Sequence, residues 1–436
     1  MGFWERRFRL SEAGTTVRRE LLGGASTYLA MAYILFVNPT LLRHAGMDPD
    51  AVFLATALAS AFAMVVMALW ANYPVALAPG MGLNAYFAFV ICGPLGFSWQ
   101  QALGATLLAG ALFLLLSLVG FRERVLQAIP RSLQMGIAAG IGLFIFHIGL
   151  QWSGLVVAEP VTLVTFGDLG RPQTLVALCG IGVAAALTVR RVPGSLLIAI
   201  AWAAAAGLVS GVLEPPGTVF RPPSLGALKE TAFRLEIPDP LKNPDFLTVV
   251  VLLLFIDLFD TVGTLVAVGH RAGLLQEGRL PRAERAFVAD AAGTTVGALL
   301  GTSTVTSYIE SAAGVTQGAR TGLSTLFVAA LFLASIVLQP LVGIIGNARF
   351  VVGPALLMVG LMMMRTLREI SWDDATEAIP AGVAVSMPFF FSITEGVALG
   401  CIAYVFCKAV AGRLRETGWT LRLVALAFLV RYLFLV

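Results

Sequence analysis

Charged side chains are scarce in this chain of 436 residues: Asp, Glu, Lys and Arg make up 12%, whereas 58% of the residues are hydrophobic. A typical soluble domain has about 25% charged residues, so the composition excludes an ordinary soluble protein. The mean hydropathy is +0.88, and runs long enough to cross a bilayer as helices recur along the sequence. We therefore expect an all-α polytopic membrane protein.

Cysteine and histidine are also few, with 4 and 3 residues. The cysteines lie in apolar segments without the spacing of metal ligands, and we interpret them as small hydrophobic residues. The sequence has no phosphate-binding GxxxxGK[ST] loop, which excludes ATP-driven chemistry within this chain. It also shows no nucleophile, histidine and acid set that the apolar segments would bring together. We expect neither an enzyme nor a bound metal or cofactor.

Apolar segments that could span a bilayer occur in fourteen places. Five arginines precede the first segment, and cations recur at the ends of later ones. Because cations flanking membrane spans stay in the cytoplasm, we expect a multi-pass protein of the cytoplasmic membrane with its N-terminus inside. The pI of 9.0 then reflects topology and not a nucleic-acid partner. The segments are 22–42, 52–71, 75–92, 100–120, 133–153, 174–189, 194–213, 246–269, 286–300, 302–318, 323–345, 351–367, 377–392 and 395–411.

The Pro-rich stretch 214–245 divides these segments into two groups of seven. Because seven is odd, the second group enters the membrane inverted, which is typical of secondary transporters. We expect 1–21 to be a cytoplasmic segment and 214–245 an extracytoplasmic loop. Within the C-terminal segment 412–436, we expect the apolar stretch 419–436 to form an interfacial helix, with a fifteenth span as the alternative.

An unusual segment is the third of the seven in each group, which makes the two segments spans 3 and 10. One is ALAPGMGLNAYFAF at 76–89, and the other is GTSTVTSYIESAAG at 301–314. Both resemble extended chain followed by a half-helix. Unwound backbone at membrane depth is tolerated only where it lines a cavity or is buried in protein. Interrupted segments at matching positions predict the binding site of a transporter.

Two acids lie inside one of the most apolar stretches, FLTVVVLLLFIDLFDTVGTLVAVG at 246–269. Asp257 and Asp260 are its only ionisable residues, and their spacing places both on one helical face. A carboxylate at that depth costs several kcal/mol unless it is paired, protonated or wetted. We expect Asp257 to contact a ligand and Asp260 to support it or to couple a cation.

The two broken segments add further polar candidates. Asn84 offers a donor and an acceptor to a ligand, although an Asn also caps half-helices well. Glu310 is either a site carboxylate, accepting ligand N–H groups or carrying a proton, or a structural partner of Arg320 or of another buried donor. Phe87 could stack on a planar ligand. Two other polar residues remain without a role: His147 is typical of a satisfied core histidine, and Asp290 could pair with a cation.

Four motifs resemble the AzgA-like branch of the nucleobase–cation symporter-2 family, whose members are adenine, guanine and hypoxanthine permeases. The resemblance runs in order over nearly the whole chain. It rests on TYLAMAYILFVNPTLL (27–42), ALAPGMGLNAYFAF (76–89), FIDLFDTVGTLVAVG (255–269) and GTSTVTSYIESAAGV (301–315).

The resemblance implies a fourteen-span 7+7 inverted repeat with short strands in spans 3 and 10. It implies elevator-like alternating access and a homodimer formed through the gate domain. The core domain would comprise 22–120 (spans 1–4) and 246–345 (spans 8–11), and the gate domain 133–213 (spans 5–7) and 351–411 (spans 12–14).

In that family the motif residues tied to purine binding fall here on Asn84, Asp257 and Glu310. We add Gly82, Phe87 and Thr27 as candidate substrate contacts, and Glu310 and Asp260 as candidates for cation coupling.

The expected function is import of purine nucleobases with a co-transported cation, for which we prefer a proton to sodium. Two alternatives stay open: an anion exchanger or channel-like protein on the same 7+7 plan, and a uracil- or xanthine-specific permease.

Overall fold

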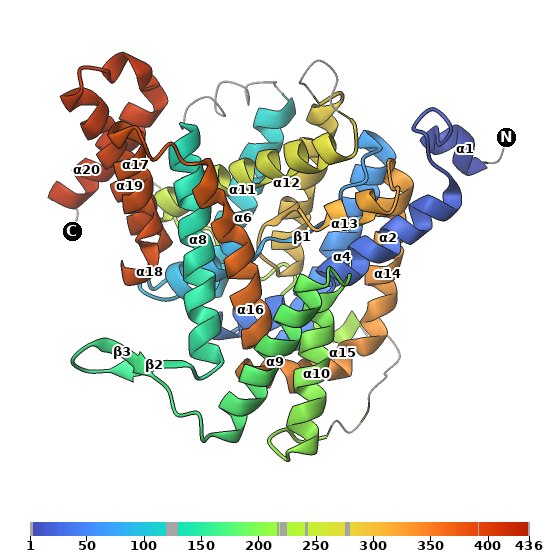
Figure 1. Ribbon diagram of the computed structural model, residues 1–436. Coiled ribbons are helices and arrows are strands. Elements are labelled where there is room, and N and C mark those ends of the chain that lie inside the picture. Colours follow the sequence, from blue (N-terminus) through green and yellow to red (C-terminus); the bar gives the residue numbers. More distant parts are fainter. Residues whose placement is uncertain are drawn as a thin grey trace. The chain divides into compact units, whose positions relative to one another are not determined.

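The computed structural model describes residues 3–118, 130–215, 218, 225–239, 243–274, 280–390 and 392–434. The described chain is mostly helical and divides into two compact units (Figure 1). The first unit comprises Met1–Leu118 and Leu150–Ala355, and the second Val119–Gly149 and Leu356–Val436. The core and gate division expected above groups the segments differently and stays a prediction.

Thirteen of the α-helices and all four strands lie in the first unit. Their bounds are α1 (Phe3–Phe8), α2 (Val17–Met31), α3 (Ile34–Leu42), α4 (Pro49–Val66), β1 (Leu77–Pro79), α5 (Met81–Tyr86), α6 (Trp99–Leu118), β2 (Val156–Glu159), β3 (Leu163–Phe166), α9 (Pro172–Val189), α10 (Ser195–Val209), α11 (Pro244–Arg271), α12 (Ala283–Leu300), β4 (Val305–Ser307), α13 (Ser311–Thr316), α14 (Gly322–Ala334) and α15 (Gln339–Asn347). Short π-helical turns, η2 (Met67–Ala71) and η3 (Phe87–Ile91), extend α4 and α5.

Two helices run from one unit into the other, and four more belong to the second unit. They are α8 (Arg131–Trp152) and α16 (Arg349–Met363), followed by α17 (Ala375–Val385), α18 (Met387–Phe390), α19 (Ile393–Val410) and α20 (Trp419–Phe434).

Every one of the fourteen predicted segments contains a helix. Nine helices in the described part of the chain are long and apolar enough to cross a membrane. Shorter apolar helices, Met81–Ile91 and Ser195–Val209, occupy predicted segments 3 and 7. The total of fourteen spans stays a prediction.

Several helix starts follow from local sequence. Asp48 accepts a hydrogen bond from the backbone of Ala51, and Pro49 begins α4. Asn243 caps α11 in the same way, and Pro244 follows it. A polar cap accepts an otherwise unpaired N–H, and proline at the first helical position has no N–H to lose. These pairs therefore define where the long helices begin.

The two broken segments meet in the middle of the first unit (Figure 1). Strand β1 pairs antiparallel with β4, with Leu77 opposite Ser307 and Pro79 opposite Val305. Each strand leads into a short helix, β1 into α5 and β4 into α13. A side-chain β-carbon on Gly80 would lie only 2.6 Å from Thr306 Cγ2, so this crossing requires glycine there. The predicted strand and half-helix in spans 3 and 10 is confirmed.

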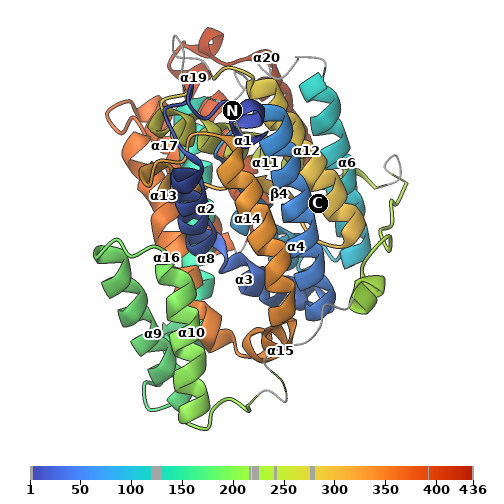
Figure 2. The ribbon, with the colours of Figure 1, turned by 90° about the vertical axis from the view of Figure 1, so that its right-hand side faces the viewer.

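Helices enclose the strand crossing on several sides. Helix α12 packs on α4, α6 and β4, and α14 packs on α2 and α4. Figure 2 shows β4 among α4, α12 and α14. The buried Glu20 on α2 accepts three backbone N–H groups, from Arg320, Thr321 and Ser324, and so ties α2 to the start of α14.

The first predicted span is interrupted, which the sequence analysis did not anticipate. Helix α2 ends at Met31 and α3 begins at Ile34, with Ala32 and Tyr33 between them. The Tyr33 side chain is fully buried. The interruption brings its hydroxyl to the site described below.

A β-hairpin between α8 and α9 is a second feature that was not predicted. Strands β2 and β3 pair from Val156 opposite Phe166 to Glu159 opposite Leu163. The hairpin extends from the helices of the first unit in Figure 1.

The second unit contains a compact ionic cluster around Lys408. The buried ammonium group lies 2.7 Å from Glu377 Oε1 and 2.9 Å from Glu416 Oε2. Arg413 also pairs with Glu416 and, together with Lys408, lowers the pKa of Glu416 to about 2. Helix α20 packs on α19. The C-terminal stretch is therefore helical as expected, while its interfacial location stays a prediction.

Candidate functional site

Strand β4 gathers three carboxylates that come from two helices. Asp257 and Asp260 project from α11, and Asp290 projects from α12. Their hydrogen bonds reach Thr294, Thr306 and Ser307, which lie on β4 or directly against it. The crossing thus places acids around backbone that is not helical.

Asp257 is almost completely buried, with 2% of its surface exposed. Thr294 Oγ1 lies 3.1 Å from its Oδ2 and 3.0 Å from the carbonyl oxygen of Val305, so one hydroxyl hydrogen serves both acceptors. The same Thr294 oxygen accepts the backbone N–H of Val305. Asp257 Oδ1 has no hydrogen-bond partner among the described residues. A buried acceptor without a partner is costly and is available to a ligand.

Asp260 lies one turn further along α11, and its side chain is exposed. Thr306 donates a hydrogen bond of 3.3 Å to its Oδ2, and Thr306 also lies 2.9 Å from the hydroxyl of Thr261. The two acids of the helix therefore differ in environment: Asp257 is enclosed and Asp260 is open. This difference agrees with separate roles for them.

Asp290 lies at the same strand and is fully buried. Ser307 donates a hydrogen bond of 3.2 Å to its Oδ2, and Oδ1 has no partner among the described residues. The expectation that Asp290 pairs with a cation is wrong for the described chain, because its recorded partner is a hydroxyl. Asp290 therefore joins Asp257 as a buried acid with one available oxygen.

Glu310 precedes the half-helix α13 and is half-buried. Tyr33, in the interruption of the first span, donates a hydrogen bond of 2.8 Å to Glu310 Oε1. Arg320 is occupied elsewhere, since its guanidinium group donates to the carbonyl oxygens of Val315 and Ala319. Glu310 is therefore not the structural partner of Arg320, and its recorded partner is another buried donor, the Tyr33 hydroxyl.

Asn84 lies in the first turn of α5 and is fully buried. Helix α5 is capped by Gly80, so the interpretation of Asn84 as the helix cap is wrong. Ser303 donates a hydrogen bond to Asn84 Oδ1. The Nδ2 group has no partner in the part of the chain that the structure describes. Asn84 thus keeps a free donor beside a strand crossing that is lined with acceptors.

The other predicted contacts are less polar. Gly82 is half-buried on α5, and Phe87 is fully buried where η3 begins. Thr27 is buried on α2, where its Oγ1 would overlap a β-carbon placed on Gly314 of α13. These three residues shape the walls around the crossing. His147 lies outside this site, half-buried on α8 in the second unit.

The crossing carries a distinctive charge pattern. Four carboxylates gather at it, and none forms an ion pair with a Lys or Arg among the described residues. The unpartnered oxygens of Asp257 and Asp290 accept hydrogen bonds, and the Asn84 amide donates them. This set suits an uncharged ligand with several N–H groups and at least one acceptor, and it disfavours an anion.

Several residues at the crossing were missed by sequence reasoning. Nothing in the local sequence marks Tyr33 as a site residue, because an aromatic residue in an apolar run is typical of core packing. The sequence contains only a weak indication of the hydroxyls of Ser303, Thr306 and Ser307, namely that 301–314 is rich in Ser and Thr. Their pairing with acids on α11 and α12 depends on how β4 crosses the bundle, which local sequence does not encode.

Solved structures with the same architecture support this description of the fold. The transmembrane domain of the cyanobacterium bicarbonate transporter BicA superposes with a TM-score of 0.64, at 17% identity, over 89% of this chain and 97% of that one. SLC26A9 gives a TM-score of 0.64 at 13% identity, over 94% of this chain and 67% of that one. The chain therefore has the fold of these 7+7 inverted-repeat transporters.

The sequence itself decides the family. Residues 18–407 match the permease family described as Xan_ur_permease. This chain belongs to the xanthine/uracil permease family. As a member of that family, it is a multi-pass membrane transporter and not an enzyme.

Curated relatives cover this permease almost from end to end. Putative permease MJ0326 of Methanocaldococcus jannaschii is 45% identical over 100% of this chain and 99% of its own. Adenine permease AdeP of Escherichia coli is 41% identical over 100% of this chain and 97% of its own. Guanine/hypoxanthine permease PbuG of Bacillus subtilis is 41% identical over 98% of this chain and 99% of its own.

Proposed function

We propose that this permease imports purine nucleobases, namely adenine, guanine or hypoxanthine. The observation that carries the proposal is the set of carboxylates at the strand crossing, which no described cation neutralises, beside the free amide of Asn84. A purine base is planar and uncharged near neutral pH, and its edge carries N–H donors and ring-nitrogen acceptors. Asp257 accepts ligand N–H groups, and Asn84 Nδ2 donates to a ring nitrogen.

The other site residues then have distinct roles. Glu310 accepts a further ligand N–H, and Tyr33 holds its carboxylate in place. Gly82, Phe87 and Thr27 shape the site around the flat base. Asp290 lies next to Ser307 and supports the same strand from the opposite helix.

We further propose that uptake is coupled to a cation, and that this cation is a proton. An uncharged substrate gains nothing from the membrane potential, whereas each co-transported charge gains about 2.3 kcal/mol per 100 mV. A carboxylate that is not fully enclosed by protein can take up and release a proton, and we assign this role to the exposed Asp260 and the half-buried Glu310. Sodium is the alternative cation.

The orientation follows from the basic residues. We propose a protein of the cytoplasmic membrane with its N-terminus inside, because five arginines precede the first span. We also retain elevator-like alternating access between core and gate domains, and a homodimer, as proposals that rest on the family resemblance.

Anion exchange is the main competing function, because structures with the same fold include a bicarbonate transporter and an anion transporter. An anion would have to lie among four carboxylates without a recorded cation partner, which electrostatics opposes. A uracil- or xanthine-specific permease is the other alternative, and its substrates differ in ring size or in the groups on the ring.

Uptake into cells that lack their own purine permeases tests the proposal. Labelled adenine, guanine and hypoxanthine are offered with and without an excess of unlabelled xanthine, uracil or bicarbonate. We expect saturable uptake of at least one labelled purine that uracil and bicarbonate do not reduce. Lack of uptake of all three would contradict the proposal, and labelled uracil, xanthine and bicarbonate offered in their place would then identify the alternative.

A further inference from the structure

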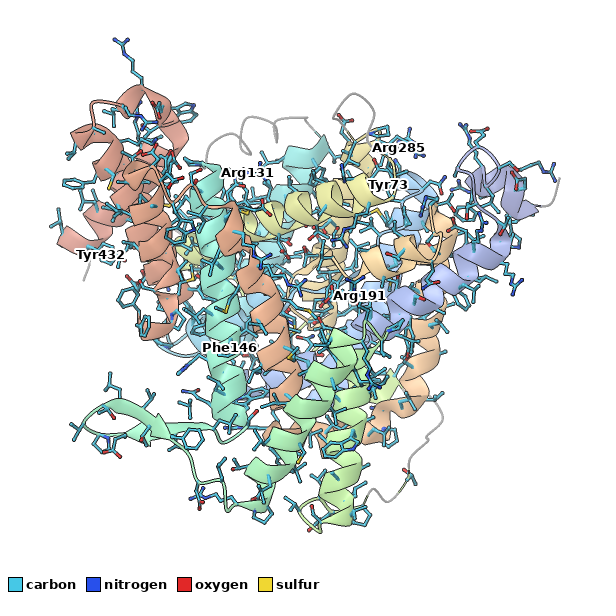
Figure 3. The ribbon with its side chains drawn as sticks, in the orientation of Figure 1. Tyr73, Arg131, Phe146, Arg191, Arg285 and Tyr432 are labelled. Atoms are coloured by element: carbon cyan, nitrogen blue, oxygen red, sulfur yellow. The ribbon has the colours of Figure 1, made fainter. Side chains whose placement is uncertain are left out.

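A cavity of about 630 Å³ opens at the end of the first unit where α1 lies. Its walls come from five places in the sequence: the N-terminal segment, the end of η2, Leu274 after α11, the start of α12, and the link between α13 and α14. Figure 3 labels Arg285 and Tyr73 at this end, close to where α12 begins. This place is separate from the strand crossing, and no role in transport has been given to it above.

Arginine dominates the lining of this cavity, which we call the arginine pocket. The five arginines are Arg7, Arg9, Arg282, Arg285 and Arg320, and Glu12 is the one acid among the described residues of the lining. Among the described ion pairs, these arginines take part in one, a contact of 3.7 Å between Arg9 and Glu12, whose side chains are both mostly exposed. Such an exposed pair contributes little. The pocket therefore has a large excess of positive charge.

Backbone oxygens and a ring hold four of these five guanidinium groups without neutralising them. Arg7 donates to the carbonyl oxygen of Leu69, and Arg285 donates to that of Trp70 at 3.4 Å. Arg282 lies over the ring of Tyr73, with 5.6 Å between the guanidinium carbon and the ring centroid. The Arg320 guanidinium donates at 2.7 Å to each of two carbonyl oxygens. Fixed but uncompensated arginines are preorganised for an anion.

The chemistry of the lining points to a phosphate group. A guanidinium presents parallel N–H donors that match two oxygens of one phosphate, and several around a cavity hold a doubly charged group. The cavity volume lies within the range of small-molecule sites. Two exposed apolar side chains, Trp70 (54% exposed) and Leu69 (42% exposed), border the same space and can cover the organic part of a phosphate ester.

We propose that the arginine pocket binds a phosphate group, carried either by a soluble phosphate ester or by the headgroup of an anionic lipid. Cations at span ends also orient membrane proteins, and that role needs neither a cavity nor fixed guanidinium groups. The proposal does not depend on which substrate the permease carries.

The test uses the purified full-length permease in nanodiscs at constant ionic strength. Inorganic phosphate and adenosine monophosphate are titrated by calorimetry in phosphatidylcholine discs. The thermal midpoint is then compared between phosphatidylglycerol and phosphatidylcholine discs. The pocket variant is Arg282→Gln/Arg285→Gln, and the matched control is Arg190→Gln/Arg415→Gln, which removes two exposed charges outside the pocket. If the double variant does not fold, Arg285→Lys replaces it as the pocket variant. This change keeps the charge but removes the planar guanidinium group.

We expect at least one phosphate-bearing probe to bind the wild type and the control alike, and the pocket variant about tenfold more weakly. Binding of phosphate or the nucleotide identifies a soluble ester. If the wild type has a higher thermal midpoint in phosphatidylglycerol discs than in phosphatidylcholine discs, and the pocket variant does not, the ligand is a lipid headgroup. The proposal is overturned if no probe has an effect, or if the pocket and control variants respond equally.

Discussion

Asp257, Asp290 and Asn84 each keep one polar atom that has no partner among the described residues. Buried polar groups are hydrogen-bonded in the great majority of proteins, so three such atoms around one strand crossing need an explanation. A ligand that supplies the missing partners explains the free oxygen of Asp257 and the free amide of Asn84 together. The same atoms then define which substitutions should affect binding more than folding.

Removing the charge of a site carboxylate should stop transport. We expect Asp257→Asn and Glu310→Gln each to lower purine uptake at least about tenfold, because a ligand N–H group that loses its buried acceptor costs about 1–3 kcal/mol. Radiolabelled uptake is compared with the amount of protein in the membrane. The exposed acids Asp168 and Glu230, changed to Asn and Gln, are controls that should transport normally. Normal uptake by both site variants would remove these residues from the site.

The hydroxyl of Tyr33 should act through Glu310. We expect Tyr33→Phe to raise the apparent KM for the purine about tenfold, since a hydrogen bond to a charged group contributes about 1.5–3 kcal/mol. Tyr28→Phe, which removes a hydroxyl from the same span but away from Glu310, is the control. Purine binding measured in the Glu310→Gln background should then be almost insensitive to Tyr33→Phe. Fully additive effects would show that Tyr33 does not position Glu310.

Asn84 should matter more for binding than for folding. We expect Asn84→Ala to weaken purine binding about tenfold and to lower the thermal midpoint less than Asn38→Ala does, because Asn84 loses a single hydrogen bond within the protein, from Ser303, and its Nδ2 has none to lose. Asn38→Ala provides the contrast, since Asn38 Nδ2 bonds Thr56 and Thr302 at 2.8 Å and its loss should reduce stability. A collapse of the Asn84→Ala protein with unchanged affinity in the folded fraction would indicate a structural role.

The elements show where sequence patterns are informative. The breaks at 76–89 and 301–314 were predictable, because Pro79 and Gly80 or a run of Ser and Thr cannot sustain an apolar helix. The interruption at Tyr33 was not, since AMAYIL contains neither Gly nor Pro and a contact to Glu310 accompanies it. The β2–β3 hairpin was missed because it lies between the predicted segments 133–153 and 174–189, where the apolar runs are too short for a span. Long-range contacts therefore account for what local patterns could not predict.

Close packing of α2 against α13 depends on a small residue. A β-carbon on Gly314 would overlap Thr27 Oγ1 and the carbonyl oxygen of Gly23. We expect Gly314→Ala to destabilise the protein by about 1–3 kcal/mol, the usual range for overpacking. Gly182→Ala on α9 is the control, because nothing lies within 4 Å of the added carbon. Thermal unfolding in detergent compares them. An equal midpoint for both variants would show that the contact tolerates a side chain.

At the scale of the whole molecule, hydropathy and charge were sufficient to predict a polytopic membrane protein and the positions of its helical segments. The positions of all fourteen segments agree with the helices because long apolar runs have few alternatives in a membrane. The acids could be identified as site candidates because a carboxylate in an apolar run is energetically costly. Their convergence on β4 could not be predicted, because it depends on the antiparallel pairing of β4 with β1. Solved structures with this fold include a bicarbonate transporter and an anion transporter, so the architecture by itself does not define the substrate.

The central claim is that the acids at the crossing bind a purine base and couple its entry to a proton. Purified protein in liposomes tests this most directly, with labelled adenine, guanine and hypoxanthine and an imposed pH gradient, acidic outside. The account predicts accumulation of at least one purine above equilibrium, its loss when a protonophore dissipates the gradient, and its absence in Asp257→Asn. Absence of purine uptake under any gradient, or uptake that responds to neither a proton nor a sodium gradient, would contradict it.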